Sequence, residues 1–561
     1  MPGARNTVDQ LEESRGRFGD NEAKTLSALS KLATSKVTDA VSLIRLHEAL
    51  LFFRAYPSSN RVLSQLDQGL KKFQSRVAQL RDEDVDLAAL DEPEVSGMAG
   101  TTVTSNFSYA VVRWLVAKYP SQLSIDWEWF EEEDRFGATM PRFMPLLEDD
   151  SMVEAHVPFR DWLRAAAGRQ NELRWIIDRF ESLEISDKAK AELYDSLKLH
   201  VTWKFGFRSS RTGSKMPTRQ IFFHDKPLIQ RRDISLVAEL NSPSIPVQKL
   251  SRAQGEKILD MARETSAVRY RELHGFTYGD ARRVLKADLG RGTEMFLMGV
   301  PPENRLPLRA YHAALVFKNS IPVAYFEGLS ICERMESGFN LYYTFREGET
   351  AWLYARILRL MRQLLGVTVS SIDPYQVGHE NEEGIESGAF WFYRKLGFRP
   401  VRPELMKLTQ SEERKMTNDR GYRTSARTLR KLAAGHMLFE LPGVSTGKWD
   451  CFQVRNIGLA VQHRMARDFN SNPREIREYS LQFVQRVLKI KTDRWADDER
   501  EGLQNLSLVL GMIPEIEKWS LNEKEMASRI IRAKGSGDEA GYLKLMQKHM
   551  KLRDALISLG S

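Results

Sequence analysis

The feature that most constrains this fold is the stretch formed by residues 321–400, in which strand patterns and helix patterns alternate. Just before and within it, residues 313–318 and 322–326 are two short apolar runs. They are joined by Asn319-Ser320, a pair of residues typical of tight turns, which predicts a β-hairpin. The chain is therefore expected to build a β-sheet here before its helices begin.

After a predicted turn at Ser337-Gly338, residues 339–345 are expected to add another strand. Residues 350–365 then carry apolar side chains at helical spacing, which predicts an amphipathic helix. Its apolar stripe consists of Leu353, Ile357, Leu360, Met361, Leu364 and Leu365. Gly366 is expected to end this helix in a left-handed conformation. The β-branched run 367–372 predicts a buried strand after it.

The turn at residues 345–351 lies between the predicted strand and the start of the predicted helix. Free backbone N–H groups and the positive end of the helix dipole suit such a turn to binding phosphate. The alternative is an ordinary strand-to-helix turn, in which Gly348 and Thr350 serve only the backbone.

Residues 389–398, AFWFYRKLGF, resemble the last motif of the GNAT superfamily of N-acetyltransferases, commonly written A-x-x-F-Y-x-K-x-G-F. The order of elements is similar to that family as well. Residues 245–250 and the helix capped by Ser251 resemble its first strand and first helix, and residues 437–441 resemble its final strand. The resemblance covers about residues 243–443 and implies an acyltransferase domain with a mixed sheet.

The resemblance implies a bound acetyl-CoA or another acyl-CoA as co-substrate. It implies that Tyr393 lies near the acyl-donor sulfur and protonates the departing thiolate. The turn is similar to the family pattern Q/R-x-x-G-x-G/A, whose amides bind the diphosphate. The implied cofactor-binding residues are Phe345, Arg346, Gly348, Glu349, Thr350, Ala351 and Glu386.

Three acidic residues depart from the family pattern. Glu349 stands at the family's middle glycine, and Gly348 is one place early. Glu386 stands where many members carry Asn. The repulsion between a carboxylate and a phosphate about 6 Å apart costs about 2–3 kcal/mol of binding free energy at an effective dielectric constant of about 20. Glu347 and Glu349 are therefore expected to point away from the cofactor.

Acyl transfer to an amine needs a deprotonated nucleophile, a stabilised oxyanion and a proton donor for the thiolate. Glu327, late in the neighbouring strand, is the best-placed carboxylate to deprotonate the amine, and a backbone N–H near Phe345 is expected to polarise the thioester carbonyl. The alternative is that neither residue is catalytic. Glu327 would then be an ordinary carboxylate at the end of a strand, and Tyr393 a half-buried tyrosine of a helix.

Composition excludes several other classes of protein. Of 561 residues only Cys332 and Cys451 are cysteines, so a disulfide scaffold and a cysteine-rich zinc site are excluded. His224-Asp225 and His379-Glu380 lack a third ligand at metal spacing, and no metal site is predicted. A catalytic pair of Cys332 as nucleophile with His379 is disfavoured, because no neighbouring residue clearly activates the thiol.

No apolar run is long enough to span a bilayer, which predicts a soluble, cytoplasmic protein without a membrane partner.

The flanking regions divide into predicted units by composition. Residues 1–35 form a polar N-terminal segment, 36–204 an all-helical domain, 205–242 a basic linker with a possible strand at 234–240, and 444–561 a C-terminal helical region. Apolar residues of 63–80 repeat at coiled-coil spacing, which favours a helix pair within the chain and leaves a dimer seam open. The oligomeric state stays unknown.

The linker carries four cations, Arg208, Arg211, Lys215 and Arg219, with interleaved Phe. They indicate either a solvated loop or a segment that binds the phosphates of a nucleic-acid backbone. The formal charge of +8 is compatible with nucleic acid without arguing for it.

Together these patterns predict an α+β protein, with a central GNAT-like mixed sheet between two all-helical regions. The predicted function is acyl-CoA-dependent N-acyl transfer to an amine of a protein, an aminoacyl group or a small molecule. A non-catalytic interaction scaffold and a nucleic-acid-binding protein are the alternatives.

Overall fold

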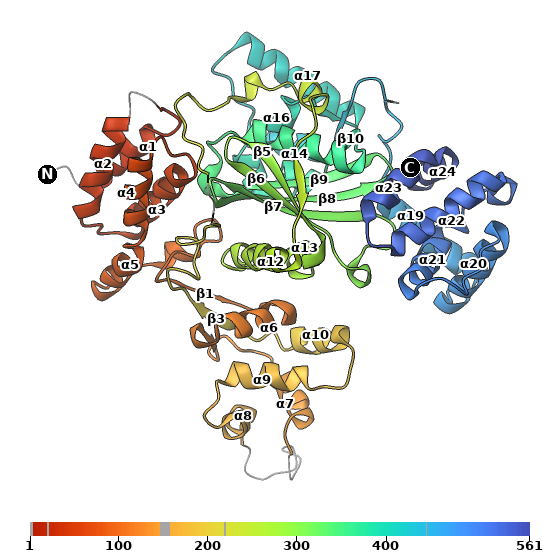
Figure 1. Ribbon diagram of the computed structural model, residues 1–561, viewed down its shortest axis with the longest axis horizontal. Helices are drawn as coiled ribbons and strands as arrows, with labels where there is room; N and C mark the ends of the chain where they lie inside the picture. Colours follow the sequence, from red (N-terminus) through yellow and green to blue (C-terminus); the bar gives the residue numbers. More distant parts are fainter. Residues whose placement is uncertain (1–3, 19–21, 146–156, 218–219, 445) are drawn as a thin grey trace.

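A nine-stranded β-sheet lies at the centre of the molecule, with helices around it (Figure 1). The computed structural model describes residues 4–18, 22–145, 157–217, 220–444 and 446–561. The strand order is β11-β12-β10-β9-β8-β7-β6-β5-β4. N-terminal helices lie at one end of the sheet, C-terminal helices lie at the other, and a smaller lobe extends from one side. The prediction of a mixed α+β chain is confirmed.

Neighbouring strands of the large sheet are antiparallel, except for β9 and β10, which are parallel. The strands are β4 Val247–Lys249, β5 Val284–Gly290, β6 Thr293–Met298, β7 Ala310–Lys318, β8 Ile321–Ile331, β9 Arg334–Leu341, β10 Val369–Ile372, β11 Arg399–Pro400 and β12 Met437–Glu440. The final strand expected at 437–441 is therefore present.

The parallel pair separates after a short contact. β10 pairs with β9 through Val369, Ser370 and Ser371, the last of which lies opposite Glu336. β9 then continues to Leu341 without β10 beside it. Residues 343–345, predicted to be part of a strand, form a 3-10 helix instead. The two strands thus diverge at the point where the chain enters the turn before the next helix.

The predicted hairpin and helix of the central stretch are present. Lys318 pairs with Ile321, and Asn319 and Ser320 have positive φ angles of 47° and 71°, as a two-residue hairpin turn with matching twist requires. Helix α14 spans Thr350–Leu365 and ends at Gly366, whose φ is 73°. Gly is favoured there because a left-handed helix end carries no Cβ penalty in glycine.

The turn expected at Ser337-Gly338 is wrong. These residues lie inside β9, paired with Gly328 and Glu327. The chain turns earlier, at Cys332 and Glu333, and Cys332 has a φ of 49°. The Glu333 carboxylate accepts hydrogen bonds from Arg553 and Trp449. This turn is stabilised by residues more than 100 positions away, which the local pattern does not reveal.

Helices cover both faces of the sheet. Helix α14 packs on one face, where Ser337 Oγ lies 2.9 Å from Tyr354 Oη. The short helix α16, Ala389–Arg394, lies on the same side. Helices α12, Arg252–Ala267, and α13, His274–Thr277, cover the other face over β5–β8. Ser251 caps α12 as expected.

The first five helices of the described chain have buried side chains that join the main core of the sheet. They are α1 Ala4–Glu13, α2 Glu22–Thr34, α3 Ala40–Ala55, α4 Asn60–Leu70 and α5 Phe73–Asp82. The expected polar segment 1–35 is mostly helical in its described parts, with Val8, Leu11 and Leu29 buried. The apolar seam at 63–80 is also buried within the chain, apart from the half-buried Leu63, which favours the intramolecular helix pair.

The smaller lobe, residues 101–205, has its own hydrophobic core and contains strands. Its elements are β1 Thr102–Ser105, α6 Tyr109–Lys118, β2 Leu123–Ile125, α7 Glu133–Thr139, α8 Phe159–Ala167, α9 Glu172–Glu181, α10 Asp187–Ser196 and β3 Val201–Lys204. The prediction of an all-helical domain at 36–204 is wrong here. Strands of three or four residues are too short to show a period, and β3 pairs with strands far earlier in the chain.

The basic linker is largely built into the structure. Arg211 is 5% exposed and pairs with Glu48. Lys215 lies 3.1 Å from Asp67, and Arg219 lies outside the described residues. The possible strand at 234–240 is wrong, because Ser235 caps a short helix, α11 Leu236–Leu240, which packs on α14. The linker therefore gives little support to nucleic-acid binding.

The C-terminal region is helical in its described residues, as predicted. Its helices are α19 Val454–Asp468, α20 Pro473–Leu488, α21 Asp497–Leu510, α22 Leu521–Gly535, α23 Glu539–Lys548 and α24 Met550–Gly560. Two further helices, α17 Pro403–Asn418 and α18 Ala426–Leu432, lie between β11 and β12. Among the helices described, none is long and apolar enough to cross a bilayer.

Candidate active site

The N-terminus of α14 offers free amide groups where β9 ends. The backbone N–H groups of Thr350, Ala351 and Trp352 donate to no described residue. The preceding residue, Glu349, gives no side-chain cap. Unpaired amides and the positive end of a 16-residue helix together favour an anion at this position.

We expected Glu349 to point outward, away from the cofactor, but its side chain is buried in the protein. Its side chain is 2% exposed and lies between two cations, 2.7 Å from Arg291 Nη2 and 3.3 Å from Lys318 Nζ. The backbone N–H of Ile229 also donates to it. Burial lowers the pKa of Lys318 to about 8, opposed by the attraction of Glu349. The Glu349 charge is thus neutralised inside the protein and does not cap the free amides.

Two N-terminal side chains approach the same turn. A Cβ at Gly348 would overlap the Tyr56 hydroxyl, so only glycine fits against α3 here. Glu347 is exposed, as expected, and lies 3.3 Å from Arg15. The N-terminal helices therefore shape the turn, whose Phe345 is buried.

Arg346 forms an ion pair with Glu383, which belongs to the short helix α15, Glu382–Glu386. The other Glu383 oxygen lies 3.8 Å from Arg271 Nη2, at the end of α12. Both arginines therefore already have a carboxylate of this protein, that of Glu383, as partner. Glu386, the last residue of α15, is exposed and forms no ion pair with any described residue.

Tyr393 lies in an aromatic cluster on the α14 face of the sheet. Its ring centroid is 5.6 Å from those of Tyr354 and Phe398. Burial raises the pKa of Tyr393 above its ordinary value, so its hydroxyl keeps the proton at neutral pH. No described residue is hydrogen-bonded to this hydroxyl, which leaves the proton free for a bound molecule.

Glu327 lies on the opposite face of the sheet from Tyr393. It accepts a hydrogen bond from the Tyr311 hydroxyl, which itself accepts one from the Gly275 amide at 3.0 Å. Burial, the nearby Glu327 charge and the hydrogen bond to Glu327 raise the pKa of Tyr311, and the Gly275 amide opposes this shift. The expected base is therefore already in use as a hydrogen-bond acceptor.

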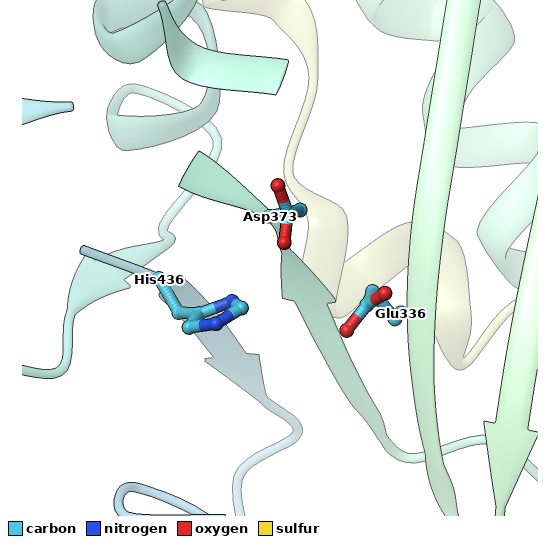
Figure 2. Close-up of side chains that lie close together, drawn as sticks. All are labelled: Glu336, Asp373 and His436. Carbon is cyan, nitrogen blue, oxygen red and sulfur yellow. The ribbon is translucent and has the colours of Figure 1, made fainter. Parts of the chain in front are cut away.

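Where β9 and β10 diverge, three further polar side chains meet (Figure 2). Glu336 of β9, Asp373 after β10 and His436 before β12 have ligand atoms that all lie within 4.8 Å of one another. Burial lowers the pKa of His436, opposed by the two carboxylates, so the imidazole is neutral near pH 7. His436 Nδ1 is buried without a hydrogen-bond partner among the described residues.

Two arginines compensate the charge of this cluster. Arg309 and Arg334 lie 3.5 Å and 3.7 Å from the Glu336 carboxylate. Two carboxylates and an imidazole are a possible ligand set for a divalent ion. With both arginines present, however, the local charge is already balanced without an ion. We therefore keep the absence of a metal as a prediction.

Sequence reasoning missed this cluster because its members are spread over three strands and 100 residues. Asp373-Pro374 after a predicted strand and a histidine directly before another were the available signals. Strand alternation places Glu336 and Gly338 on the Glu327 face, and Ser337 on the Tyr393 face. The strand divergence therefore has the Tyr393 hydroxyl on one side and the unpaired Nδ1 of His436 on the other.

The residues that the sequence set aside remain unsuited to catalysis. Burial raises the pKa of the Cys332 thiol, and His379 is exposed. His224 is packed among the rings of Phe18, Tyr56 and Phe222.

No protein-family model, no curated protein and no solved structure matches this chain.

Proposed function

We propose that this protein is an acyl-CoA-dependent N-acyltransferase of the GNAT type. The observation that carries the proposal is the divergence of parallel β9 and β10 beside the free amides of α14. Such a divergence leaves backbone groups of β9 without a strand partner beside a helix N-terminus. An acyl-pantetheine chain with a diphosphate at one end fits this combination of groups.

The proposed reaction uses side chains on both faces of the sheet. The amine nitrogen attacks the thioester carbon, a C–N bond forms, and the C–S bond then breaks. His436 accepts the proton of the amine, and the carboxylates of Glu336 and Asp373 stabilise the resulting imidazolium. Tyr393 donates a proton to the leaving thiolate from the other face. An unpaired N–H of β9 beyond Glu336 stabilises the oxyanion.

The acceptor approaches from the face that carries the Glu336–Asp373–His436 cluster. Glu327, Tyr311 and Arg271 lie on the same face and offer further polar groups. An amine of a protein, an aminoacyl group or a small molecule would each meet this surface.

The second candidate is a non-catalytic scaffold, favoured by one specific contact. Glu383 already neutralises Arg346, a cation of the α14 turn, and lies near Arg271 as well. Unless Glu383 yields to a phosphate, the turn does not bind the coenzyme.

Calorimetric titration with acetyl-CoA and with a longer acyl-CoA separates the two candidates. The enzyme proposal expects micromolar affinity for at least one donor, followed by acceptor-dependent release of free thiol. If the folded protein takes up neither donor, the scaffold becomes the better account.

A further inference from the structure

A separate cavity of about 380 Å³ lies on the α14 face of the sheet, near the far end of that helix. Strands β4–β7, the last turn of α14, the residues just before α23 and the first part of α23 line it. Leu364 and Leu365 line it, whereas the free amides of α14 lie at the opposite end of the helix. The cavity is therefore distinct from the candidate active site, and its volume falls in the range of small-molecule sites.

A buried histidine of β7 lines this cavity. His312 is 7% exposed, and its Nδ1 has no hydrogen-bond partner among the described residues. Leaving a buried polar group unpaired costs about 1–3 kcal/mol. Burial lowers the pKa of His312, so the ring is neutral at pH 7 and needs a hydrogen-bonding partner rather than a counter-charge. The cavity is the available place for that partner.

The charges around the cavity favour an anion. Lys249, Arg283, Arg305 and Lys544 line it, together with Asp538 and Glu539. Lys249 and Lys544 are exposed and form no ion pair with a described residue. Glu539 is neutralised by Lys534 and Arg283 by Asp280, whereas Asp538 keeps its charge and accepts a hydrogen bond from the Ala540 amide at 2.9 Å. Arg305, Lys249 and Lys544 outnumber Asp538. The lining therefore carries a net positive charge, with two lysines free to meet a ligand.

The rest of the lining is apolar. Leu285, Leu297 and Val300 come from the strands and the loop after β6, and Leu364 and Leu365 come from α14. A ligand that satisfies both parts needs an anionic head and a hydrocarbon body.

We propose that this cavity binds a small amphiphilic anion, a medium-chain carboxylate or alkyl phosphate, at a site separate from the acyl-transfer site. The anionic head lies between Lys249 and Lys544, and a head-group oxygen or a water it carries pairs with His312. The hydrocarbon body packs against the leucines. This proposal does not depend on the protein being an acyltransferase.

Titration of the full chain with octanoate, octyl phosphate, octanol and octylamine tests the proposal. We expect octanoate or octyl phosphate to bind at least tenfold more tightly than octanol, and octylamine not to bind. The stronger of the two anions identifies the head group. Equal binding of octanol and the anions, or no binding of either anion at millimolar concentration, would overturn the proposal.

Three variants, one of them a control, test whether the ligand binds in this cavity. Lys249→Gln combined with Lys544→Gln should weaken anion binding about tenfold or more, whereas Lys257→Gln, an exposed lysine on α12, should leave it unchanged. His312→Leu should weaken binding while keeping or raising the melting temperature, because it removes an unpaired polar group. If the double lysine variant binds like the wild type, the anion lies elsewhere and the proposal fails.

Discussion

The carboxylate of Glu383 accepts a hydrogen bond from the guanidinium of Arg346, the residue that begins the turn before α14. Arg271 lies 3.8 Å from the second carboxylate oxygen. A side-chain anion thus occupies the position between two arginines that a phosphate of the proposed co-substrate would favour. Coenzyme binding and this ion pair are therefore expected to compete.

Glu383→Gln should raise the affinity for acetyl-CoA about three- to tenfold, because it removes the competing charge and leaves Arg346 free. Calorimetric titration at fixed ionic strength measures the change. The matched control is Glu382→Gln on the same helix, where the ion pair with Arg430 is exposed. An equal effect of both variants would mean that only the overall charge matters.

Tyr393→Phe should lower kcat for acyl transfer about 100-fold or more, since general acid catalysis typically contributes at least this much. The melting temperature should stay nearly constant, because the hydroxyl donates to no described residue. Tyr354→Phe is the control within the same aromatic cluster, and its hydroxyl is bonded to Ser337. If both variants lose the same activity, Tyr393 acts through packing and not as a proton donor.

His436→Gln should lower kcat about 100-fold and leave the affinity for acetyl-CoA unchanged, because His436 lies on the acceptor face. The pH profile of the residual rate should also lose its acidic limb. Glu327→Gln provides the comparison. A large loss with Glu327→Gln and none with His436→Gln would return the role of base to the residue that the sequence suggested.

Dialysis against a chelator should change neither the acyl-transfer rate nor the melting temperature. Arg309 and Arg334 already balance the carboxylates of the Glu336–Asp373–His436 cluster, so no cation is needed for charge. Activity that chelation removes and Zn²⁺ or Mn²⁺ restores would contradict this. In that case Glu336 and His436 would be ligands.

The sequence predicted the central elements well because their signals are local. The apolar stripe of α14, the left-handed Gly366 and the Asn319-Ser320 hairpin each depend on a few neighbouring residues. The resemblance also pointed to Tyr393, which lies in a buried cluster near the diverging strands. Membership of the GNAT superfamily stays a prediction.

The errors have a common physical cause, which is long-range pairing. Glu349 is buried because Arg291 and Lys318, on or beside two other strands, neutralise it. The lobe strand β3 exists because strands about 80–100 residues earlier pair with it. His436 meets Glu336 only through the sheet. None of these partners lies within the window in which periodicity and turn signals act.

Lowering the pH from about 6.5 to 4 should destabilise the protein through His47 of α3. His47 is fully buried, with Nε2 2.8 Å from Thr212 Oγ1 and Nδ1 3.1 Å from Glu48. Burial lowers its pKa from 6.5 to about 4, helped by the charges of Arg211 and Arg269 and opposed by Glu48. Between these values the unfolded chain binds a proton that the folded protein does not, so the free energy of unfolding falls as the pH falls.

Each pKa unit corresponds to about 1.4 kcal/mol, so His47 contributes a loss of about 3 kcal/mol over this pH range. Denaturant unfolding at a series of pH values measures the slope. His47→Gln keeps a side chain that can bond to Thr212 and should flatten the slope between pH 6.5 and 4. His463→Gln, an exposed histidine of α19, should leave it unchanged. An unchanged slope in His47→Gln would show that His47 is not the group whose protonation opposes folding.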